Sequence, residues 1–450
     1  MNQPTKTSEY LAIVCEQMRW KKAHHVVTQE IENHIIDQRD AYIADGLDEE
    51  TATVNAIKEM GDPVLVGTAL DRTHRPKVAW SIIILTSCIV IFGFIVRLFM
   101  INSGDSPGSV TDNITALLLG IGCMIIVYFI DFTILGKYAK IIYIGLVVFT
   151  ILGMFFFPTI YGQHRFILYI ILLFPVVFAA IIYQMRSKGY LGIIMSVVFF
   201  IIPVLFALEA PSFASATLFV VTGLLLFTIA IIKGWFHVNR LLALLIVYTP
   251  IITLVALIIS GNRVWERVKL ALINAFQMEG GDYITSIVWE IIAGAKLFGQ
   301  GAAELHMNIA LPAIHAEFLL IYFIHKLGWI SFIGMMAFII TFIIRAYILS
   351  SKQKSVLGKL VSISVITTFT LQVMLYVAFS FGILIFSPPS LPLISDGGLT
   401  LIVNMMLIGI LISVFKSGDL VRDRLPRQNP HKLLEFNNGK IIIHLKTKER

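Results

Sequence analysis

Charge is what this sequence has least of. Only 14% of its 450 residues are Asp, Glu, Lys or Arg, whereas a soluble globular protein contains roughly 25%. Hydrophobic residues make up 57% of the chain, and its mean hydropathy is +0.84. So few charges exclude a chain that is soluble throughout. They predict an all-α polytopic membrane protein in which long apolar helices cross the bilayer.

Nucleotide, metal and redox motifs are also missing from the sequence. The three cysteines have no metal-ligand spacing, and Cys88 and Cys123 lie inside apolar runs, which predicts packing residues and no disulfide. His24 and His25 form an isolated pair on a polar helix. The single Gly-x-Gly, at residues 299–301, precedes no phosphate-binding strand and helix. We therefore expect no metal centre and no nucleotide cofactor.

The chain has a net charge of +7 and an isoelectric point near 9.2. Much of this basic excess lies between the apolar segments and in residues 417–450. Basic residues in such positions set membrane topology and face anionic lipid. The excess therefore predicts membrane lipids as partners and no nucleic acid.

Residues 1–76 are polar and have the spacing of short helices, so they predict a small cytosolic helical domain without a cleavable signal peptide. A helix is expected from about His24 to Ala44, and Asp48 is expected to cap the next one. The segment GLDEETATVNAIKEMGDPVLVGTAL, residues 46–70, resembles the permease prefix domain found ahead of membrane proteins in Gram-positive bacteria. That resemblance implies a regulatory or docking unit; a solvated helical cap without a partner is the alternative.

Ten apolar segments follow, and each is long enough to cross a membrane as a helix. They lie at residues 78–100, 114–136, 141–157, 166–185, 190–208, 214–232, 241–260, 317–345, 356–382 and 399–416. Together they predict a ten-helix membrane domain over residues 77–416. A basic cytosolic tail is expected over residues 417–450.

Lysine and arginine are distributed unevenly among the connections between these segments. The connections expected on the inside contain Lys137, Lys140, Arg186, Lys188, Lys233, Arg240, Lys352 and Lys354. Those at residues 101–113, 209–213 and 383–398 contain no Lys or Arg. Because basic residues are retained on the cytosolic side, both termini are predicted to be cytosolic and the long loop at residues 261–316 to lie outside the cell.

The long outer loop leads into the stretch Leu311–Gly328, which places His315 and Glu317 at the mouth of the eighth apolar segment. A carboxylate at a membrane boundary is costly unless it has a partner, water or a function. The same loop contains NRVWERVKLALINAF, residues 262–276. Its apolar and basic residues predict a helix that lies in the membrane interface.

From about Tyr283 to Gly409 the sequence resembles the shape, elongation, division and sporulation (SEDS) family, which includes FtsW, RodA and SpoVE. The matching blocks are Tyr283, LFGQG at 297–301, Leu311-Pro312, His315, Glu317-Phe318, Leu327-Gly328, Arg345, Gln372, LPLISDGG at 391–398, Asn404-Met405 and Gly409. The resemblance implies a ten-helix fold in a bacterial cell membrane and peptidoglycan glycosyltransferase activity. The implied substrate is lipid II, an undecaprenyl-pyrophosphate disaccharide-pentapeptide, polymerised at the outer face beside a class B penicillin-binding protein.

Glycan polymerisation needs a base for the acceptor sugar hydroxyl and cationic groups for the departing diphosphate. The family position implies that Glu317 is the base; a carboxylate stabilised by the dipole of its helix is the alternative. Arg165, Arg267 and Lys296 are the candidates for the diphosphate, with snorkelling toward lipid headgroups as the alternative for each. His315 either orients Glu317 or caps its helix.

Ser395 and Asp396 in the last outer loop are further substrate-binding candidates, although Asp396 also fits a turn that bonds to its own backbone. A divalent cation bound with the diphosphate is the one ion that this chemistry suggests. The family has Asp where this chain has Glu317, and two acids where it has His325 and Lys326. These departures keep a second class of function open, a non-catalytic scaffold or lipid-linked precursor transporter (flippase) that works with a penicillin-binding protein.

Overall fold

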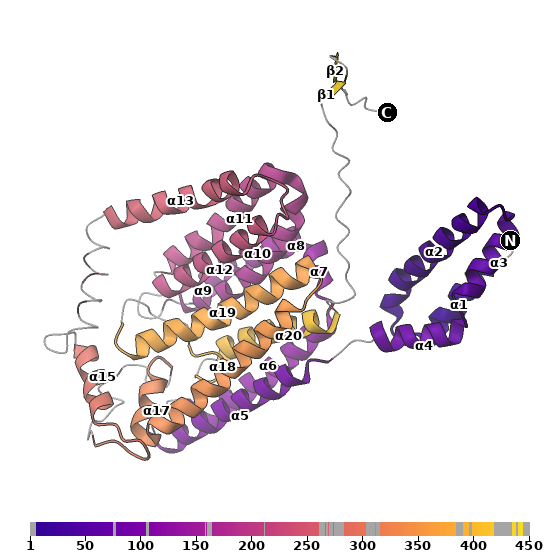
Figure 1. Ribbon diagram of the computed structural model, residues 1–450. Coiled ribbons are helices and arrows are strands. Elements are labelled where there is room, and N and C mark those ends of the chain that lie inside the picture. Colours follow the sequence, from indigo (N-terminus) through magenta and orange to yellow (C-terminus); the bar gives the residue numbers. More distant parts are fainter. Residues whose placement is uncertain are drawn as a thin grey trace.

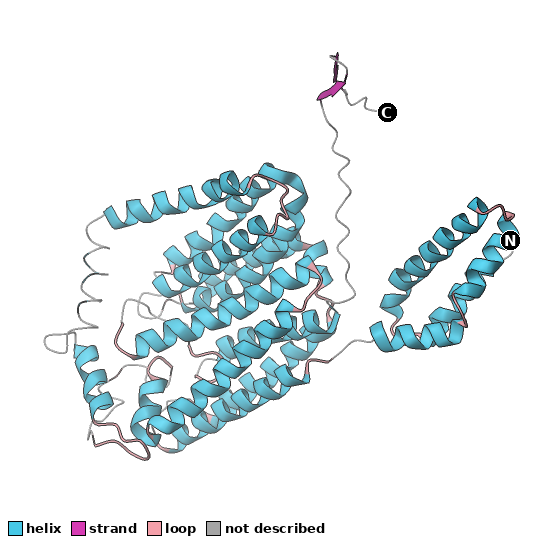
Figure 2. Ribbon diagram, in the orientation of Figure 1, coloured by secondary structure: helices cyan, strands magenta, loops and turns pink. Residues whose placement is uncertain are grey.

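The structure, a computed structural model, is built almost entirely from helices (Figures 1 and 2). It describes residues 6–74, 78–104, 108–157, 159, 164–210, 212–260, 266, 269, 273, 283–302, 311, 316–383, 390–395, 398–417, 434–437 and 440–443. One short hairpin in the tail, β1 (Leu434–Asn437) with β2 (Lys440–Ile443), is antiparallel. All other described elements are helical, which confirms the predicted fold class.

Four helices form an N-terminal unit with an apolar core of its own, which includes Val14, Val27 and Ala56. They are α1 (Lys6–Gln17), α2 (Lys21–Ala44), α3 (Glu49–Glu59) and α4 (Pro63–His74). The predicted cap of α3 is confirmed, because the side chain of Asp48 accepts a hydrogen bond from the Thr51 N–H at 3.0 Å. Packing of one apolar face from each helix is therefore enough to define this unit.

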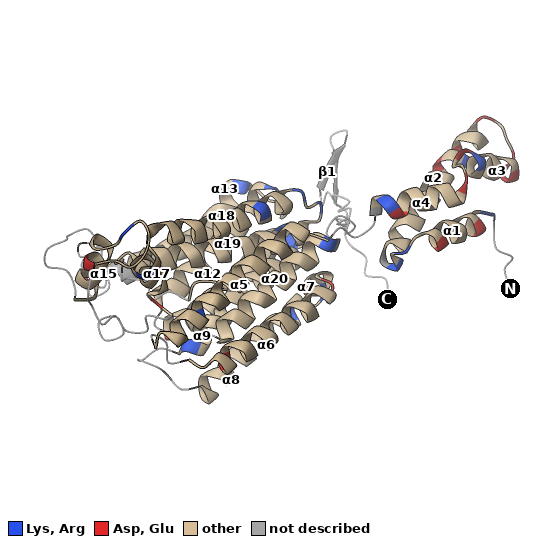
Figure 3. Cartoon of the chain, turned by 90° about the horizontal axis from the view of Figure 1, so that it is seen from below, with Lys and Arg blue, Asp and Glu red and all other residues tan. Residues whose placement is uncertain are grey.

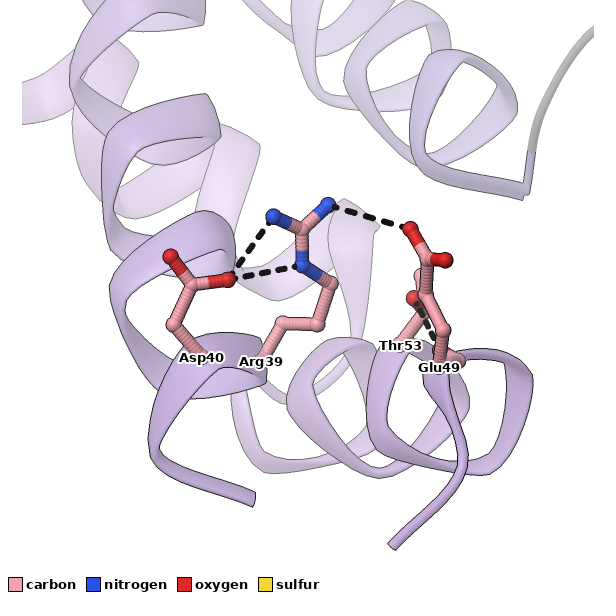
Figure 4. A network of polar contacts seen from close by, with 4 residues as sticks. All are labelled: Arg39, Asp40, Glu49 and Thr53. Carbon is pink, nitrogen blue, oxygen red and sulfur yellow. Dashed lines mark hydrogen bonds and ion pairs between the residues drawn. The ribbon is translucent and has the colours of Figure 1, made fainter. Parts of the chain in front are cut away.

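An exposed polar network joins α2 to α3 (Figure 4). The guanidinium of Arg39 lies 2.8 Å from the Asp40 carboxylate and 3.9 Å from that of Glu49. Thr53 donates a hydrogen bond to the backbone oxygen of Glu49 at 2.7 Å. Exposed ion pairs of this kind contribute about 0–1 kcal/mol, so the apolar core holds the unit together more than this network does.

Between the N-terminal unit and the tail hairpin, the described chain forms a bundle of apolar helices. In order these are α5 (Trp80–Asn102), α6 (Val110–Phe129), α7 (Thr133–Lys137), α8 (Ala139–Phe156), α9 (Arg165–Ile170), η1 (Ile171–Leu173), α10 (Phe174–Met185), η2 (Arg186–Lys188), α11 (Gly189–Glu209), α12 (Phe213–Ile232), α13 (Arg240–Ser260), α15 (Tyr283–Ala293), α17 (Leu319–Leu327), α18 (Trp329–Ser351), α19 (Val356–Ser380) and α20 (Gly398–Ser417).

Eight helical runs among the described residues are long and apolar enough to cross a membrane. One of them, Arg165–Glu209, has 45 residues and contains two crossings, because η2 interrupts it and α10 packs against α11. The 21-residue helix α13 adds another apolar helix of sufficient length. The described part of the chain therefore accommodates the ten crossings that the sequence predicts.

Successive helices run in alternate directions, which gives the bundle two ends. We call the end where α5 begins and α20 ends the near end, and the opposite one, with α9, α15 and α17, the far end (Figure 1). Lys and Arg residues are concentrated at the near end, around α7 and the start of α13 (Figure 3). The candidate site residues Arg165 and Glu317 belong to the far end.

Helices α6 and α20 pack closely through glycine. A Cβ at Gly120 would lie 3.2 Å from the Met405 side chain, and one at Gly409 would lie 2.7 Å from the backbone oxygen of Met124. Small residues at helix contacts let membrane helices gain packing where lipid offers no hydrophobic driving force. The last helix is thereby fixed against the second crossing.

The prediction of one continuous helix over residues 317–345 is wrong. Helix α17 ends at Leu327 and α18 begins at Trp329, and Gly328 between them has φ +88°. A Cβ at Gly328 would lie 2.5 Å from the backbone oxygen of Leu297, so only glycine fits this break without strain. Glu317 consequently precedes a short buried helix and does not lie in the first turn of a transmembrane helix.

Candidate active site

Glu317 lies at the far end, in the turn that leads from Ala316 into α17. Its carboxylate Oε1 lies 3.6 Å from Nη2 of Arg165, the first residue of α9. The Glu317 side chain is 29% exposed and that of Arg165 is 30% exposed. The fold thus brings two of the sequence-predicted candidates into one half-buried ion pair that remains accessible from outside the bundle.

Two opposing effects set the pKa of Glu317. Burial disfavours the charged carboxylate and raises its pKa above the usual value, and the positive charge of Arg165 lowers it by a smaller amount. The net effect is a raised pKa. A carboxylate with a raised pKa is a better proton acceptor than an ordinary one, which suits the role of general base.

The segment that carries Glu317 is anchored by its apolar neighbours. The side chains from Phe318 to Ile324 are buried, and the ring of Phe318 packs against that of Phe379 in α19, with centroids 5.0 Å apart. A short apolar helix that buries nearly all of its side chains cannot easily move without exposing them. Glu317 is therefore presented from a rigid support.

Tyr376 of α19 is a site residue that the sequence analysis did not identify. Its hydroxyl donates a hydrogen bond to the backbone oxygen of Ala316 at 2.8 Å and accepts one from the N–H of Leu319 at 3.1 Å. No pattern distinguished it, because a tyrosine in an apolar segment is usually a packing residue. Its contacts on both sides of Glu317 appear only in the fold.

Lys296 is not brought next to Glu317. Its backbone oxygen accepts a hydrogen bond from the N–H of Trp329 at 3.1 Å, so it lies where α18 begins. Helix α17 has nine residues and is about 13 Å long at 1.5 Å per residue, and Glu317 is at its other end. The exposed Lys296 side chain therefore lies at the opposite end of α17 from the ion pair.

Ser395 is turned inward in the structure. It is 4% exposed, and its hydroxyl donates a hydrogen bond to the backbone oxygen of Leu391 at 3.1 Å. The same turn is held by Arg97 of α5, which is buried and donates to the backbone oxygens of Leu393 and Ile394 at 3.2 and 3.1 Å. Ser395 thus stabilises the last outer turn, and its hydroxyl faces the protein.

Three further candidates, Arg267, His315 and Asp396, lie outside the described residues. Most of the predicted interfacial helix at residues 262–276 lies outside them as well. The roles assigned to these residues from the sequence stay predictions.

His325 occupies a position where the resemblance to the SEDS family implies an acid. It is 2% exposed, and its backbone oxygen accepts a hydrogen bond from the N–H of Gly301 at 2.7 Å. Burial lowers the pKa of His325, and the charge of Lys326 lowers it further, so the ring is mainly neutral at pH 7. The replacement puts a neutral, packed side chain against the LFGQG segment in place of a carboxylate.

Among the residues that the structure describes, no three His, Cys, Asp or Glu side chains gather closely enough to hold a metal ion. The Glu317 carboxylate is balanced by Arg165 instead. A divalent cation that arrives with a diphosphate stays a prediction from the sequence.

A bundle of about ten apolar helices, with a carboxylate and an arginine paired at one end, defines a multi-pass membrane protein whose candidate site lies at the membrane boundary. The FtsW/RodA/SpoVE family of cell cycle proteins matches residues 76–419. The chain belongs to this family. The family match begins after α1–α4 and includes the whole helix bundle.

Two curated relatives carry the name probable peptidoglycan glycosyltransferase FtsW. The chain is 25% identical over 137 residues to that of Trichlorobacter lovleyi, a match covering 29% of this chain and 36% of the relative. It is 27% identical over 127 residues to that of Geobacter metallireducens, covering 28% and 34%. The chain thus matches about a third of the length of these curated relatives.

Solved structures share the fold. One, from a study of how a peptidoglycan synthase complex coordinates polymerization and crosslinking, gives a TM-score of 0.59 at 17% identity and covers 77% of this chain and 99% of its own. Another, the rod shape determining protein RodA of Thermus thermophilus, gives a TM-score of 0.51 at 14% identity, with coverages of 76% and 97%. At these identities the likeness shows the fold alone.

Proposed function

We propose that this protein polymerises lipid II into glycan strands, as a peptidoglycan glycosyltransferase of the SEDS type. The observation that carries the proposal is the pairing of Glu317, whose pKa is raised, with Arg165 at one end of the bundle. Membership of the FtsW/RodA/SpoVE family and the names of the relatives support the reaction class.

In the proposed step, the hydroxyl oxygen of the acceptor sugar forms a bond to the anomeric carbon of the donor sugar. The hydroxyl proton passes to the carboxylate of Glu317. The bond between the anomeric carbon and the diphosphate breaks, and its electron pair leaves with undecaprenyl diphosphate. Arg165 stabilises the negative charge that develops on this leaving group.

Arg165 couples the two halves of this step. In the structure its charge lowers the pKa of Glu317. A diphosphate that engages Arg165 offsets this effect with its own negative charge, so the pKa of Glu317 rises. Glu317 therefore becomes a stronger base once the leaving group is in place.

We place the site on the outer face of a bacterial cell membrane, with both termini in the cytosol, because Lys and Arg gather at the near end of the bundle (Figure 3). A class B penicillin-binding protein is the proposed partner. The likeness to a peptidoglycan synthase complex supports this partner. A divalent cation carried in with the diphosphate would help Arg165 to neutralise the negative charge of the diphosphate.

The test is polymerisation of labelled lipid II by the purified protein, alone and with candidate class B penicillin-binding proteins, with products separated on a gel. We expect polymer from the wild type. The rate of Glu317→Gln should be lower by about 100-fold or more. The control Glu290→Gln removes an exposed carboxylate from α15 at the same end of the bundle and should retain the full rate.

If Glu317→Gln makes polymer at the wild-type rate, the protein is a polymerase but Glu317 is not its base. No polymer from the wild type with any partner would refute the glycosyltransferase and favour the scaffold or transporter.

A further inference from the structure

The hydroxyl of Tyr376 bridges the turn around Glu317. It bonds to the backbone one residue before Glu317, at Ala316, and two residues after it, at Leu319. Tyr376 is 0% exposed. A buried backbone group is costly when it loses its hydrogen-bond partner, so one hydroxyl with two bonds fixes the conformation of the turn from both sides.

The same face of α19 also holds the last outer segment. Gln372 lies four residues before Tyr376, and residues four apart share one face of a helix. The buried Nε2 of Gln372 donates a hydrogen bond to the backbone oxygen of Ser390 at 2.9 Å. Ser390 directly precedes the turn Leu391–Ser395. One helix face therefore contacts both the turn that carries Glu317 and the last outer segment.

From these contacts we propose that Tyr376 is a positioning residue, whose hydroxyl sets the place of the Glu317 carboxylate opposite Arg165. Gln372 fixes the last outer segment to the same face of α19 through its hydrogen bond to Ser390. The proposal rests on the proposed function, because the position of Glu317 affects the rate only if Glu317 takes a proton. Phe379, three residues after Tyr376, adds an apolar contact through the ring of Phe318.

The hydroxyl is the only group that tyrosine has and phenylalanine lacks. Tyr376→Phe keeps the ring in α19 but leaves Ala316 and Leu319 without their shared partner. The turn is then free to shift, and a misplacement near 1 Å lowers a catalytic rate about 100-fold. Because Tyr376 is buried beneath the turn, it has no access to substrate. The substitution should therefore lower kcat and have little effect on KM.

Tyr143→Phe is the matched control. Tyr143 of α8 is 1% exposed, and its hydroxyl donates a hydrogen bond to the backbone oxygen of Phe199 at 2.6 Å. It is thus a buried tyrosine with a backbone partner in the same bundle, and neither of these residues belongs to the site. Tyr143→Phe removes a buried hydrogen bond to the backbone, as Tyr376→Phe does, but leaves the turn around Glu317 unchanged.

Wild type and both variants are compared for melting temperature and for the rate of lipid II polymerisation over a range of lipid II concentrations. Tyr376→Phe should lower kcat about 10–100-fold and leave KM within about twofold. Tyr143→Phe should leave both constants unchanged, with a similar decrease in melting temperature. Unchanged kcat in Tyr376→Phe, or an equal loss in Tyr143→Phe, overturns the positioning role.

Hydrogen exchange gives a readout that does not depend on catalysis. The amide of Leu319 should exchange about tenfold faster in Tyr376→Phe than in the wild type and at the wild-type rate in Tyr143→Phe. Unchanged exchange in Tyr376→Phe also overturns the proposal. A wild type that makes no polymer refutes the proposed function instead, and the exchange rates then still decide whether Tyr376 holds the turn.

Discussion

The chemistry of Glu317 depends on a balance between burial and one neighbouring charge. Burial raises its pKa and Arg165 lowers it, with burial the larger effect. A general base accepts a proton only when it is deprotonated. The rate of polymerisation should therefore rise with pH through the raised pKa of Glu317, giving an acid limb above the range usual for a glutamate.

Replacement of Arg165 by Gln removes the charge that lowers the pKa of Glu317. The pKa should rise further, so the acid limb of the pH profile of kcat/KM should move to higher pH. The maximum rate should also decrease about 100-fold, since the diphosphate loses a cationic partner. Arg165→Lys keeps the positive charge and should move the limb less. A limb that stays in place or moves to lower pH in Arg165→Gln would contradict the coupling.

Arg97 is predicted to stabilise the last outer turn. Its replacement by Met keeps an apolar side chain of similar length but leaves the oxygens of Leu393 and Ile394 without this donor. We expect the free energy of unfolding to decrease by about 1–3 kcal/mol, measured by denaturant unfolding in detergent. Arg345→Met, at an exposed position of α18, is the control and should change it by about 0.5 kcal/mol at most.

The sequence identified Glu317 and Arg165 separately, but their pairing depends on how α9 and α17 meet in the bundle. Arg97 did leave a signal, because a charge inside the predicted segment 78–100 indicates a buried polar role. Tyr376 left none. Its function comes from its distance to two backbone groups, and hydropathy does not encode such a distance.

Among the elements, the pair α17 and α18 shows where hydropathy is insufficient. Apolar residues resume at Leu327 and Trp329 after His325 and Lys326, and a single glycine inside a helical pattern is usually tolerated. The break at Gly328 is decided by tertiary contacts, since the N–H of Trp329 bonds to the oxygen of Lys296. The other crossings were predictable from the length and apolar composition of their segments, although α6 ends at Phe129, inside the predicted segment 114–136, and η1 interrupts the segment 166–185.

Gly328→Ala tests this break. The backbone there has φ +88°, and the added Cβ would lie 2.5 Å from the oxygen of Leu297. We expect a loss of about 1–3 kcal/mol in the free energy of unfolding. Gly334→Ala in α18 is the matched control, because its Cβ would meet nothing within 4 Å, and it should be neutral or stabilising by about 0.5–1 kcal/mol. Equal effects of the two substitutions would contradict the assigned role of Gly328.

For the whole molecule, composition already predicted a helical membrane bundle, because so few charges leave little alternative to apolar helices. The structure adds that α1–α4 enclose a core distinct from that of the bundle. The family match begins at residue 76, after this unit. The binding partner of residues 1–76 and the cytosolic position of both termini stay predictions, since neither follows from packing within one chain.

Glu317 is proposed to be the base of a lipid II polymerase. The most direct measurement is the polymerisation rate of wild type, Glu317→Gln and Glu317→Asp with labelled lipid II and the partner that supports most activity. We predict a loss of about 100-fold or more for Glu317→Gln and retained activity for Glu317→Asp, which restores the acid that the family has. A Glu317→Gln variant that polymerises lipid II as fast as the wild type would contradict the claim.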